Sequence, residues 1–160
     1  MYKIRYHMNI IPYNPIYAEQ VATLFYHTVH AINNDVYTTA QKSAWAPHAF
    51  DLNTWKLRLQ TSMPYLAMSK QTVIGFIELR PSGYIDCMYV HPDWQRNGVG
   101  QLLYDHILTI TKEQHIERLY VDASHTAKPF FDKQGFQVVQ TNIIQKDDVQ
   151  LENTTMELYV

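Results

Sequence analysis

The order of the predicted elements constrains the fold of this chain more than any other feature. Three short strands follow one another closely, at residues 65–68, 73–79 and 84–90, with turn residues between them. A helix of about four turns then begins at Gly98, because apolar residues recur there at three- and four-residue spacing, and another strand follows at 117–122. A strand meander joined to a strand–helix–strand unit predicts a mixed α/β sheet.

The flanking segments add to this sheet. Residues 3–11 alternate loosely and predict a first strand, while 136–144 and 151–160 predict two closing strands. Amphipathic spacing predicts a helix at 18–32. Capping and turn residues predict two more helices, one at 51–61, capped near Asp51 or Asn53, and one at 126–134. Residues 37–47 are predicted to form a short helix or an ordered loop. We therefore expect one domain over residues 1–160, with about six or seven mostly antiparallel strands flanked by helices.

Composition excludes several classes of protein. The formal net charge is −2 and the basic residues are scattered, so the chain lacks the basic footprint of a nucleic-acid binder. No run of about 18 apolar residues indicates a membrane span. The single cysteine, Cys87, rules out an internal disulfide framework and suits a reducing compartment, which predicts a cytoplasmic location.

Two of the five glycines, Gly98 and Gly100, stand where a predicted strand gives way to a predicted helix. The first backbone N–H groups of a helix lack partners within the helix, and its N-terminus carries about half a positive charge. Glycine also lets an anion approach the backbone closely. The segment therefore predicts a phosphate site, although no Gly-Lys-Ser/Thr or G-x-G-x-x-G pattern is present.

Two motifs in this region resemble those of one family. Residues 95–100, Gln-Arg-Asn-Gly-Val-Gly, resemble the acetyl-CoA motif Q/R-x-x-G-x-G/A of the GCN5-related N-acetyltransferases (GNAT). Residues 127–136, Ala-Lys-Pro-Phe-Phe-Asp-Lys-Gln-Gly-Phe, resemble the A-x-x-L-Y-E-K-x-G-F segment of the same family. The two motifs occur in the family's order and about 30 residues apart, which is far more specific than either motif alone.

The resemblance implies a GNAT-like fold in which the fourth and fifth strands splay apart around acetyl-CoA. Backbone groups of the fourth strand would bind the pantetheine arm and the amides after Gln95 would bind the pyrophosphate. Ser124 and Lys128 would lie beside the cofactor, although Lys128 fits a solvated surface lysine equally well. The implied cofactor residues are Met88, Tyr89, Val90, Gln95, Arg96, Asn97, Gly98, Val99, Gly100, Gln101, Ser124, Lys128 and Phe131.

The chain departs from the family pattern at Phe131. Many relatives carry a tyrosine there, which protonates the departing thiolate, and phenylalanine has no hydroxyl. A thiol of pKa near 8.5 gives a fair leaving group, so the chemistry does not depend wholly on this acid. If an acid is present, we expect it at Ser124, at another tyrosine or as water.

A base is also required, because an ammonium group has no lone pair with which to attack a thioester. Asp86 is the first candidate, since it interrupts an apolar strand, and period-two alternation places it on the face of Tyr84 and Met88 and opposite Cys87. The alternative is that Asp86 is exposed or pairs with an arginine. Glu78 and His125 are the other candidate bases. The histidines form no metal-binding pattern, so we expect no metal.

The acceptor is predicted to be a primary amine of a small molecule or peptide, bound mainly by the N-terminal helical region. Aromatic side chains attract cations, so Tyr37 and Trp45 are candidates, unless they only anchor the two helices. The predicted acceptor residues are Asn33, Tyr37, Trp45 and Tyr84. The closing strands are also able to pair between two copies of the chain. Alternatives to an enzyme are a non-catalytic acyl-CoA sensor, favoured by Phe131, and a nucleotide-binding module.

Overall fold

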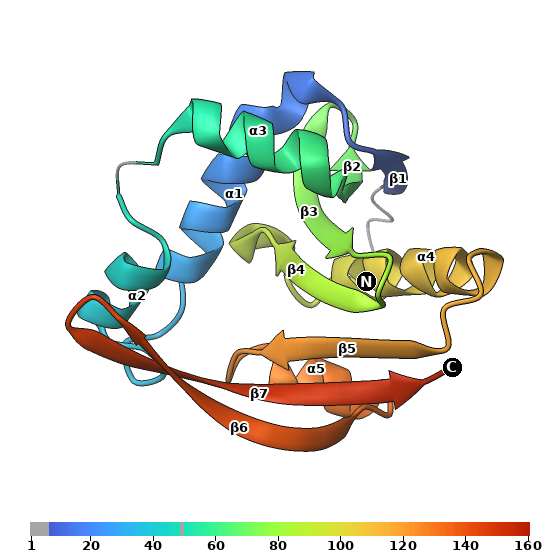
Figure 1. Ribbon diagram of the computed structural model, residues 1–160. Helices are drawn as coiled ribbons and strands as arrows, with labels where there is room; N and C mark the ends of the chain where they lie inside the picture. Colours follow the sequence, from blue (N-terminus) through green and yellow to red (C-terminus); the bar gives the residue numbers. More distant parts are fainter. Residues whose placement is uncertain (1–6, 49) are drawn as a thin grey trace, which may run out of the picture.

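The protein forms one seven-stranded mixed sheet (Figure 1). The computed structural model describes residues 7–48 and 50–160. Its strands are β1 (Asn9–Pro12), β2 (Tyr65–Ser69), β3 (Thr72–Leu79), β4 (Tyr84–Val90), β5 (Arg118–Ala123), β6 (Gln137–Lys146) and β7 (Val149–Tyr159). They are ordered β1-β2-β3-β4-β5-β7-β6, and all neighbours are antiparallel except β4 and β5. This confirms the predicted mixed, mostly antiparallel sheet.

The first strand that the structure describes begins at Asn9. Residues 3–6 of the predicted strand lie outside the described residues, and residues 7 and 8 belong to no strand. β1 extends to Pro12 and pairs on one side only, with β2. Proline has no N–H to donate to a neighbouring strand. An edge strand tolerates it, because such a strand has a neighbour on one side only.

Within the described residues, five α-helices flank the sheet: α1 (Ala18–His30), α2 (Thr39–Trp45), α3 (Leu52–Ser62), α4 (Val99–Glu113) and α5 (Lys128–Lys133). The segment predicted as a short helix or ordered loop is helical, because Thr38 and Gln41 form a reciprocal capping box at the start of α2. The Asp51 side chain caps α3, as predicted. Gly135, which follows the C-cap residue of α5, has a φ of 90°, a backbone conformation that favours glycine. No described helix has the length and hydropathy needed to cross a bilayer.

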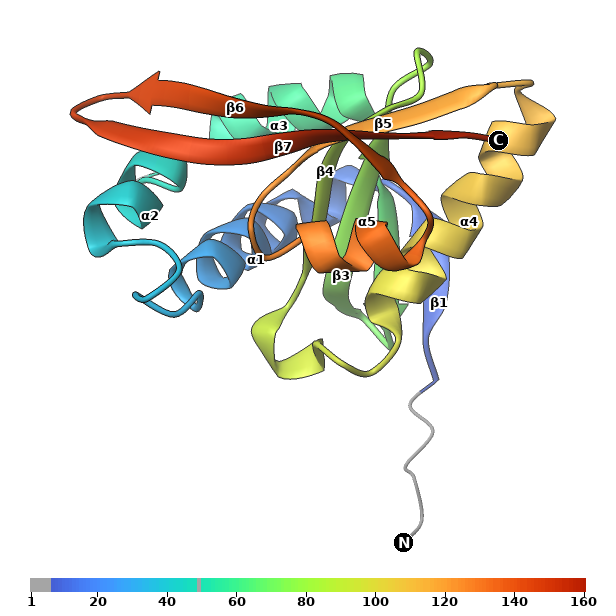
Figure 2. The same ribbon diagram turned by 90° about the horizontal axis from the view of Figure 1, so that it is seen from below.

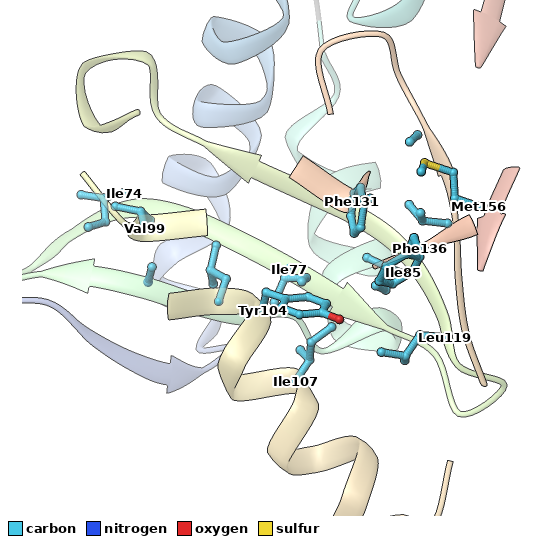
Figure 3. Close-up of a cluster of buried hydrophobic side chains, with 14 residues drawn as sticks. Ile74, Ile77, Ile85, Val99, Tyr104, Ile107, Leu119, Phe131, Phe136 and Met156 are labelled. Carbon is cyan, nitrogen blue, oxygen red and sulfur yellow. The ribbon is translucent and has the colours of Figure 1, made fainter. Parts of the chain in front are cut away.

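The helices cover the two faces of the sheet in two layers (Figure 2). On one face, side chains of α4, α5 and the strands form a large buried cluster, which includes Leu103, Ile107 and Phe131 (Figure 3). On the other face, α1 and α3 pack through Val21 and Leu59 against strand residues. The sheet is therefore buried on both sides along its central strands.

β4 and β5 pair over a very short length. Only Tyr84 with Tyr120 and Ile85 with Val121 are in register, although β4 continues to Val90. Beyond these two pairs the strands diverge, as the ribbons in Figure 1 show. The predicted splay between the fourth and fifth strands is present.

A β-bulge interrupts β4 at Asp86. Glu78 pairs with Cys87 and Leu79 pairs with Ile85, so Asp86 is an extra residue in the ladder. As a result Ile85 belongs to the cluster on the α4 face, whereas Cys87 belongs to the cluster on the α1 and α3 face. The prediction that Cys87 and Asp86 lie on opposite faces of the sheet is therefore wrong. Alternation of side chains between the two faces holds only where the pairing of the strands is unbroken.

The β6–β7 hairpin extends far beyond the rest of the sheet. Its connecting end reaches α2 (Figure 1), where the side-chain amide of Gln41 donates a hydrogen bond to the carbonyl oxygen of Gln150 (2.9 Å). This contact joins the C-terminal hairpin to the N-terminal helices.

Candidate active site

Two cavities meet where β4 and β5 separate. The larger cavity, of about 800 Å³, runs from the start of α4 to this point. Every residue predicted to bind the cofactor lines it, except Asn97 and Lys128. The predicted residues in its wall are Met88, Tyr89, Val90, Gln95, Arg96, Gly98, Val99, Gly100, Gln101, Ser124 and Phe131.

The outer end of the larger cavity has the geometry of an anion site. Gly98 is the N-cap of α4 with a φ of 83°, and a Cβ built on it would have no atom within 4 Å. The backbone there is open to a ligand, and the first N–H groups of a fifteen-residue helix follow it. Arg96, which also lines the cavity, adopts a φ of 62°. A pyrophosphate group therefore fits this end of the cavity.

Two residues predicted to bind the cofactor, Asn97 and Lys128, are not among those that line the larger cavity. Lys128 forms an ion pair of 2.9 Å with Asp132 one turn along α5, and it lines neither cavity. This agrees with the alternative of a surface lysine. The Asn97 side chain is exposed and donates a hydrogen bond to the carbonyl oxygen of Gln95 (3.0 Å), which stabilises the loop before α4.

The smaller cavity, of about 380 Å³, lies on the other side of the splay. Tyr37, Trp45 and Tyr84 line it, together with Asp86 and Ser124. It shares part of its wall with the larger cavity, namely Trp45, Met88, Tyr89, Ser124, Ala127 and Phe131. A group that enters through one cavity therefore comes into reach of a group held in the other.

Asn33 does not reach the smaller cavity. It lines the larger one, where its side-chain oxygen accepts a hydrogen bond from the backbone N–H of Asp35 (2.9 Å) in the turn after α1. The His125 side chain lines neither cavity. Its ring stacks on Tyr37 with 5.4 Å between the centroids, and its Nε2 lies 4.0 Å from a Glu152 carboxylate oxygen.

A network of charged side chains lies beside the smaller cavity. The Asp86 carboxylate pairs with Arg80 at 2.6 Å and lies 3.9 Å from Arg58. Arg58 also pairs with Glu78 at 2.9 Å, and Ser62 donates a second hydrogen bond to Glu78 (3.1 Å). Glu78 is fully buried, whereas 27% of the Asp86 side chain is exposed. Of the two carboxylates, only Asp86 lines the cavity.

Cys87 completes a group of three possible metal ligands with Glu78 and Asp86, whose ligand atoms lie within 4.8 Å of one another. Both carboxylates are already paired with arginines, however, and the Arg58 guanidinium lies 2.9 Å from the Cys87 sulfur. Burial raises the pKa of the Cys87 thiol, and the nearby Glu78 raises it further. Cys87 is thus held as a neutral thiol and is a poor nucleophile.

The tyrosines around the two cavities are proton donors rather than bases. Burial raises the pKa of Tyr37, and it raises the pKa of Tyr89 well above the usual value. Burial also raises the pKa of Tyr84, and the Asp122 carboxylate, which accepts a hydrogen bond from it (3.1 Å), adds to the shift. All three phenols therefore keep their protons at neutral pH.

Several residues of the smaller cavity were not predicted from the sequence. Asp122 comes from the outward face of β5, and alternation with Leu119, Val121 and Ala123 would have indicated it. Lys146 and Glu152 come from the β6–β7 hairpin. No local pattern marks them, because they reach the cavity only through the packing of the hairpin on α2.

The chain is similar to known proteins in both sequence and structure. Residues 33–159 match the family described as the acetyltransferase (GNAT) domain. The chain is 35% identical over 133 residues to the uncharacterised N-acetyltransferase YafP of Escherichia coli K12, covering 83% of each protein.

Two solved structures extend this similarity. A GCN5-related N-acetyltransferase from Rhodopseudomonas palustris superposes with a TM-score of 0.90 at 30% identity, covering the whole of both chains. The PaiA N-acetyltransferase of Thermoplasma acidophilum, solved in complex with coenzyme A, has a TM-score of 0.76 at 17% identity and covers 96% of this chain and 99% of its own.

Proposed function

The chain belongs to the GNAT acetyltransferase family, and on that premise we propose that it transfers the acetyl group of acetyl-CoA to a primary amine. The acceptor is a small molecule or a peptide, and its amine attacks the thioester directly while both substrates are bound. The observation that carries this proposal is the meeting of the two cavities between β4 and β5. One cavity fits the donor and the other leaves room for an acceptor.

The donor is proposed to bind in the larger cavity. Gly98 and the start of α4 would hold the pyrophosphate, because the backbone there is open and helix N-terminal N–H groups bind anions. Met88, Tyr89 and Val90 would pair with the pantetheine arm along the edge of β4 that β5 leaves uncovered. Acetyl-CoA supplies an activated acyl group, and the residues around the splay direct it toward the smaller cavity.

Asp86 is proposed as the base, acting through a water molecule. It is one of three carboxylates in the wall of the smaller cavity, with Asp122 and Glu152, and it is the one that lies on β4 beside Arg80 and Arg58. The contacts with these two guanidinium groups hold the carboxylate in place at the wall of the cavity. Glu78 remains the second candidate, although Arg58 and Ser62 enclose it. His125 is third, because it lines neither cavity.

The test is release of free thiol from acetyl-CoA in the presence of polyamines, amino acids, aminoglycosides and peptide N-termini. The proposal predicts thiol release that depends on the amine and saturates with both substrates. Tight binding of acetyl-CoA without thiol release across a broad panel would favour the sensor function that Phe131 suggests. Competition by ATP but not by acetyl-CoA would favour a nucleotide-binding module.

Two further parts of the proposal concern the surroundings of the chain. β6 is an edge strand with four exposed aliphatic side chains, Val138, Val139, Ile143 and Ile144, so we propose that it pairs with β6 of a second copy. Light scattering of the native chain tests this, because a monomer at high concentration contradicts it. We also propose a cytoplasmic location, since the free Cys87 suits a reducing compartment, and cell fractionation tests it.

A further inference from the structure

The charges in the wall of the smaller cavity do not balance. The charged side chains there are Asp86, Asp122, Glu152 and Lys146. Asp86 belongs to the network of two arginines and two carboxylates described above, which is neutral as a whole. Across the described part of the chain, no lysine or arginine forms an ion pair with Asp122 or Glu152. These two carboxylates therefore give the cavity an excess of negative charge.

The Asp122 carboxylate is held in a fixed position in this wall. One of its oxygens accepts a hydrogen bond from the hydroxyl of Tyr84 on β4 (3.1 Å), and the other accepts one from the hydroxyl of Thr155 on β7. Its donors thus come from the strands on both sides of β5. Each carboxylate oxygen has a further lone pair, so Asp122 is able to accept a hydrogen bond from a ligand without losing these two.

The aromatic side chains of the cavity favour the same kind of ligand for an independent reason. The rings of Tyr37, Trp45 and Tyr84 line the cavity together with Asp122, and the Tyr37 and Trp45 rings lie edge to face with 5.4 Å between their centroids. The face of an aromatic ring attracts a cation that lies within about 6 Å of its centre. An anion gains nothing from these rings, so they add to the preference for a positively charged group.

Asp122 lies a short distance from the junction of the two cavities. Ser124 lines both cavities and is two positions beyond Asp122, and alternation along β5 places the two side chains on the same side. At about 3.3 Å a residue, the two positions are about 7 Å apart. A group bound at Asp122 is therefore separated from the junction by the length of a short carbon chain.

Lys146 is too far from Asp122 to neutralise it. Asp122 pairs with Thr155 of β7, whereas Lys146 pairs with Val149 near the tip of the hairpin. At about 3.3 Å a residue, Thr155 and Val149 are about 20 Å apart along β7. Within the described residues Lys146 also forms no ion pair. An acceptor bound through Lys146 would carry a carboxylate in place of a second amine.

We propose that the acceptor is a small molecule with two amino groups joined by a short spacer, and that Asp122 binds the ammonium group that does not react. The inference rests on the proposed function and names its substrate class. The reacting amine loses its proton before it attacks the thioester, whereas the second amine keeps its charge. Glu152 adds a longer-range attraction, and a cavity of about 380 Å³ has the size of a site for a small ligand.

Three acceptors of equal length test the proposal: 1,5-diaminopentane, pentylamine and 5-aminopentanoate. They differ only at the far end, which is an ammonium, a methyl or a carboxylate group. Thiol release from acetyl-CoA should give the highest kcat/KM with the diamine and the lowest with the aminopentanoate. The diamine should exceed pentylamine by at least about fivefold beyond the factor of about two that its second identical amine supplies.

Asp122→Asn removes the charge and keeps nearly the same shape. It should reduce the preference for the diamine over pentylamine to about twofold, mainly by raising KM for the diamine, with little change for pentylamine. Glu152→Gln should reduce the preference by a smaller factor. Asp148→Asn is the matched control, because it removes one charge from the same hairpin but is exposed and lines neither cavity. Its preference should equal that of the native chain.

Calorimetric titration with the same three compounds should give the same order of affinities without turnover, in the free chain and in the chain saturated with coenzyme A. Equal affinities for the diamine and pentylamine would overturn the proposal, as would an unchanged preference in Asp122→Asn. Tighter binding of 5-aminopentanoate would also overturn it and would assign Lys146 to a carboxylate of the acceptor. If Asp122→Asn does not fold, Glu152→Gln provides the comparison.

Failure of the proposed function has a different result. In that case coenzyme A does not bind, or none of the three amines releases thiol. The order of affinities in the free chain and its dependence on Asp122 then decide the present proposal separately.

Discussion

Replacing Gly98 by Asn and by Asp separates the backbone conformation of this residue from the electrostatics of the proposed pyrophosphate site. Gly98 has a φ of 83°, which Asn and Asp tolerate better than other side chains, and a Cβ there meets no atom within 4 Å. Both variants should therefore fold, with a loss in the free energy of unfolding of about 1 kcal/mol. Asp is also a good N-cap residue, so Gly98→Asp should be at least as stable as Gly98→Asn.

Gly98→Asp should bind coenzyme A more weakly than Gly98→Asn does, although it should be at least as stable. A unit charge about 4 Å from a phosphate charge is repelled by about 1 kcal/mol in water and about 4 kcal/mol at the effective dielectric constant of a protein surface. Gly98→Asp should accordingly bind coenzyme A about fivefold to a thousandfold more weakly than Gly98→Asn, which has nearly the same shape.

Calorimetric titration of both variants measures this difference, and thermal unfolding measures their stability. Raising the ionic strength from 0.1 M to 1 M should narrow the gap in affinity, because the screening length falls from about 10 Å to about 3 Å. Equal affinities of the two variants at low salt would show that no phosphate lies at the start of α4, and would refute the reasoning.

Two further predictions concern the charged network. Asp86→Asn keeps a hydrogen-bonding partner for Arg80 but removes the proposed base. The value of kcat should therefore fall at least tenfold, most strongly at low pH, while the affinity for coenzyme A stays unchanged. An unaltered kcat would show that Asp86 is not the base. Arg58→Met leaves the buried Glu78 carboxylate without its main partner. Removal of one partner from a buried ion pair commonly costs about 3–5 kcal/mol. Because 39% of the Arg58 side chain is exposed, we expect a smaller loss in the free energy of unfolding, about 2–4 kcal/mol, measured by urea denaturation. A loss under about 1 kcal/mol would contradict this.

The sequence was sufficient for the features that depend on local signals. Apolar spacing, the cap at Asp51 and the turn residues gave most helices and strands within a few residues of their observed bounds. The segment 95–101 combines a strand end, glycines and a helix start within a few positions, so its place in the larger cavity was foreseeable, apart from the outward-facing Asn97.

Features that depend on pairing or distant packing were not foreseeable. The bulge at Asp86 appears only in the register of β3 with β4, and it changes which face each later residue of β4 occupies. Arg58 comes from α3 to join the network, and Glu152 reaches the smaller cavity because the hairpin packs on α2. No local sequence pattern indicates that Arg58 joins the charged network or that Glu152 reaches the cavity.

The contact between β4 and β5, which consists of two residue pairs, would have a consequence for the lifetime of the protein in the cell. This short seam joins the part of the sheet that carries α4 to the part that carries the long hairpin. An acyl donor bound as proposed would lie along this seam and touch both parts. A ligand that binds only the folded state, at a hundred times its Kd, adds about 2.7 kcal/mol to the free energy of unfolding. The supply of acyl donor would then govern how much of the chain escapes proteolysis, as well as how fast it works.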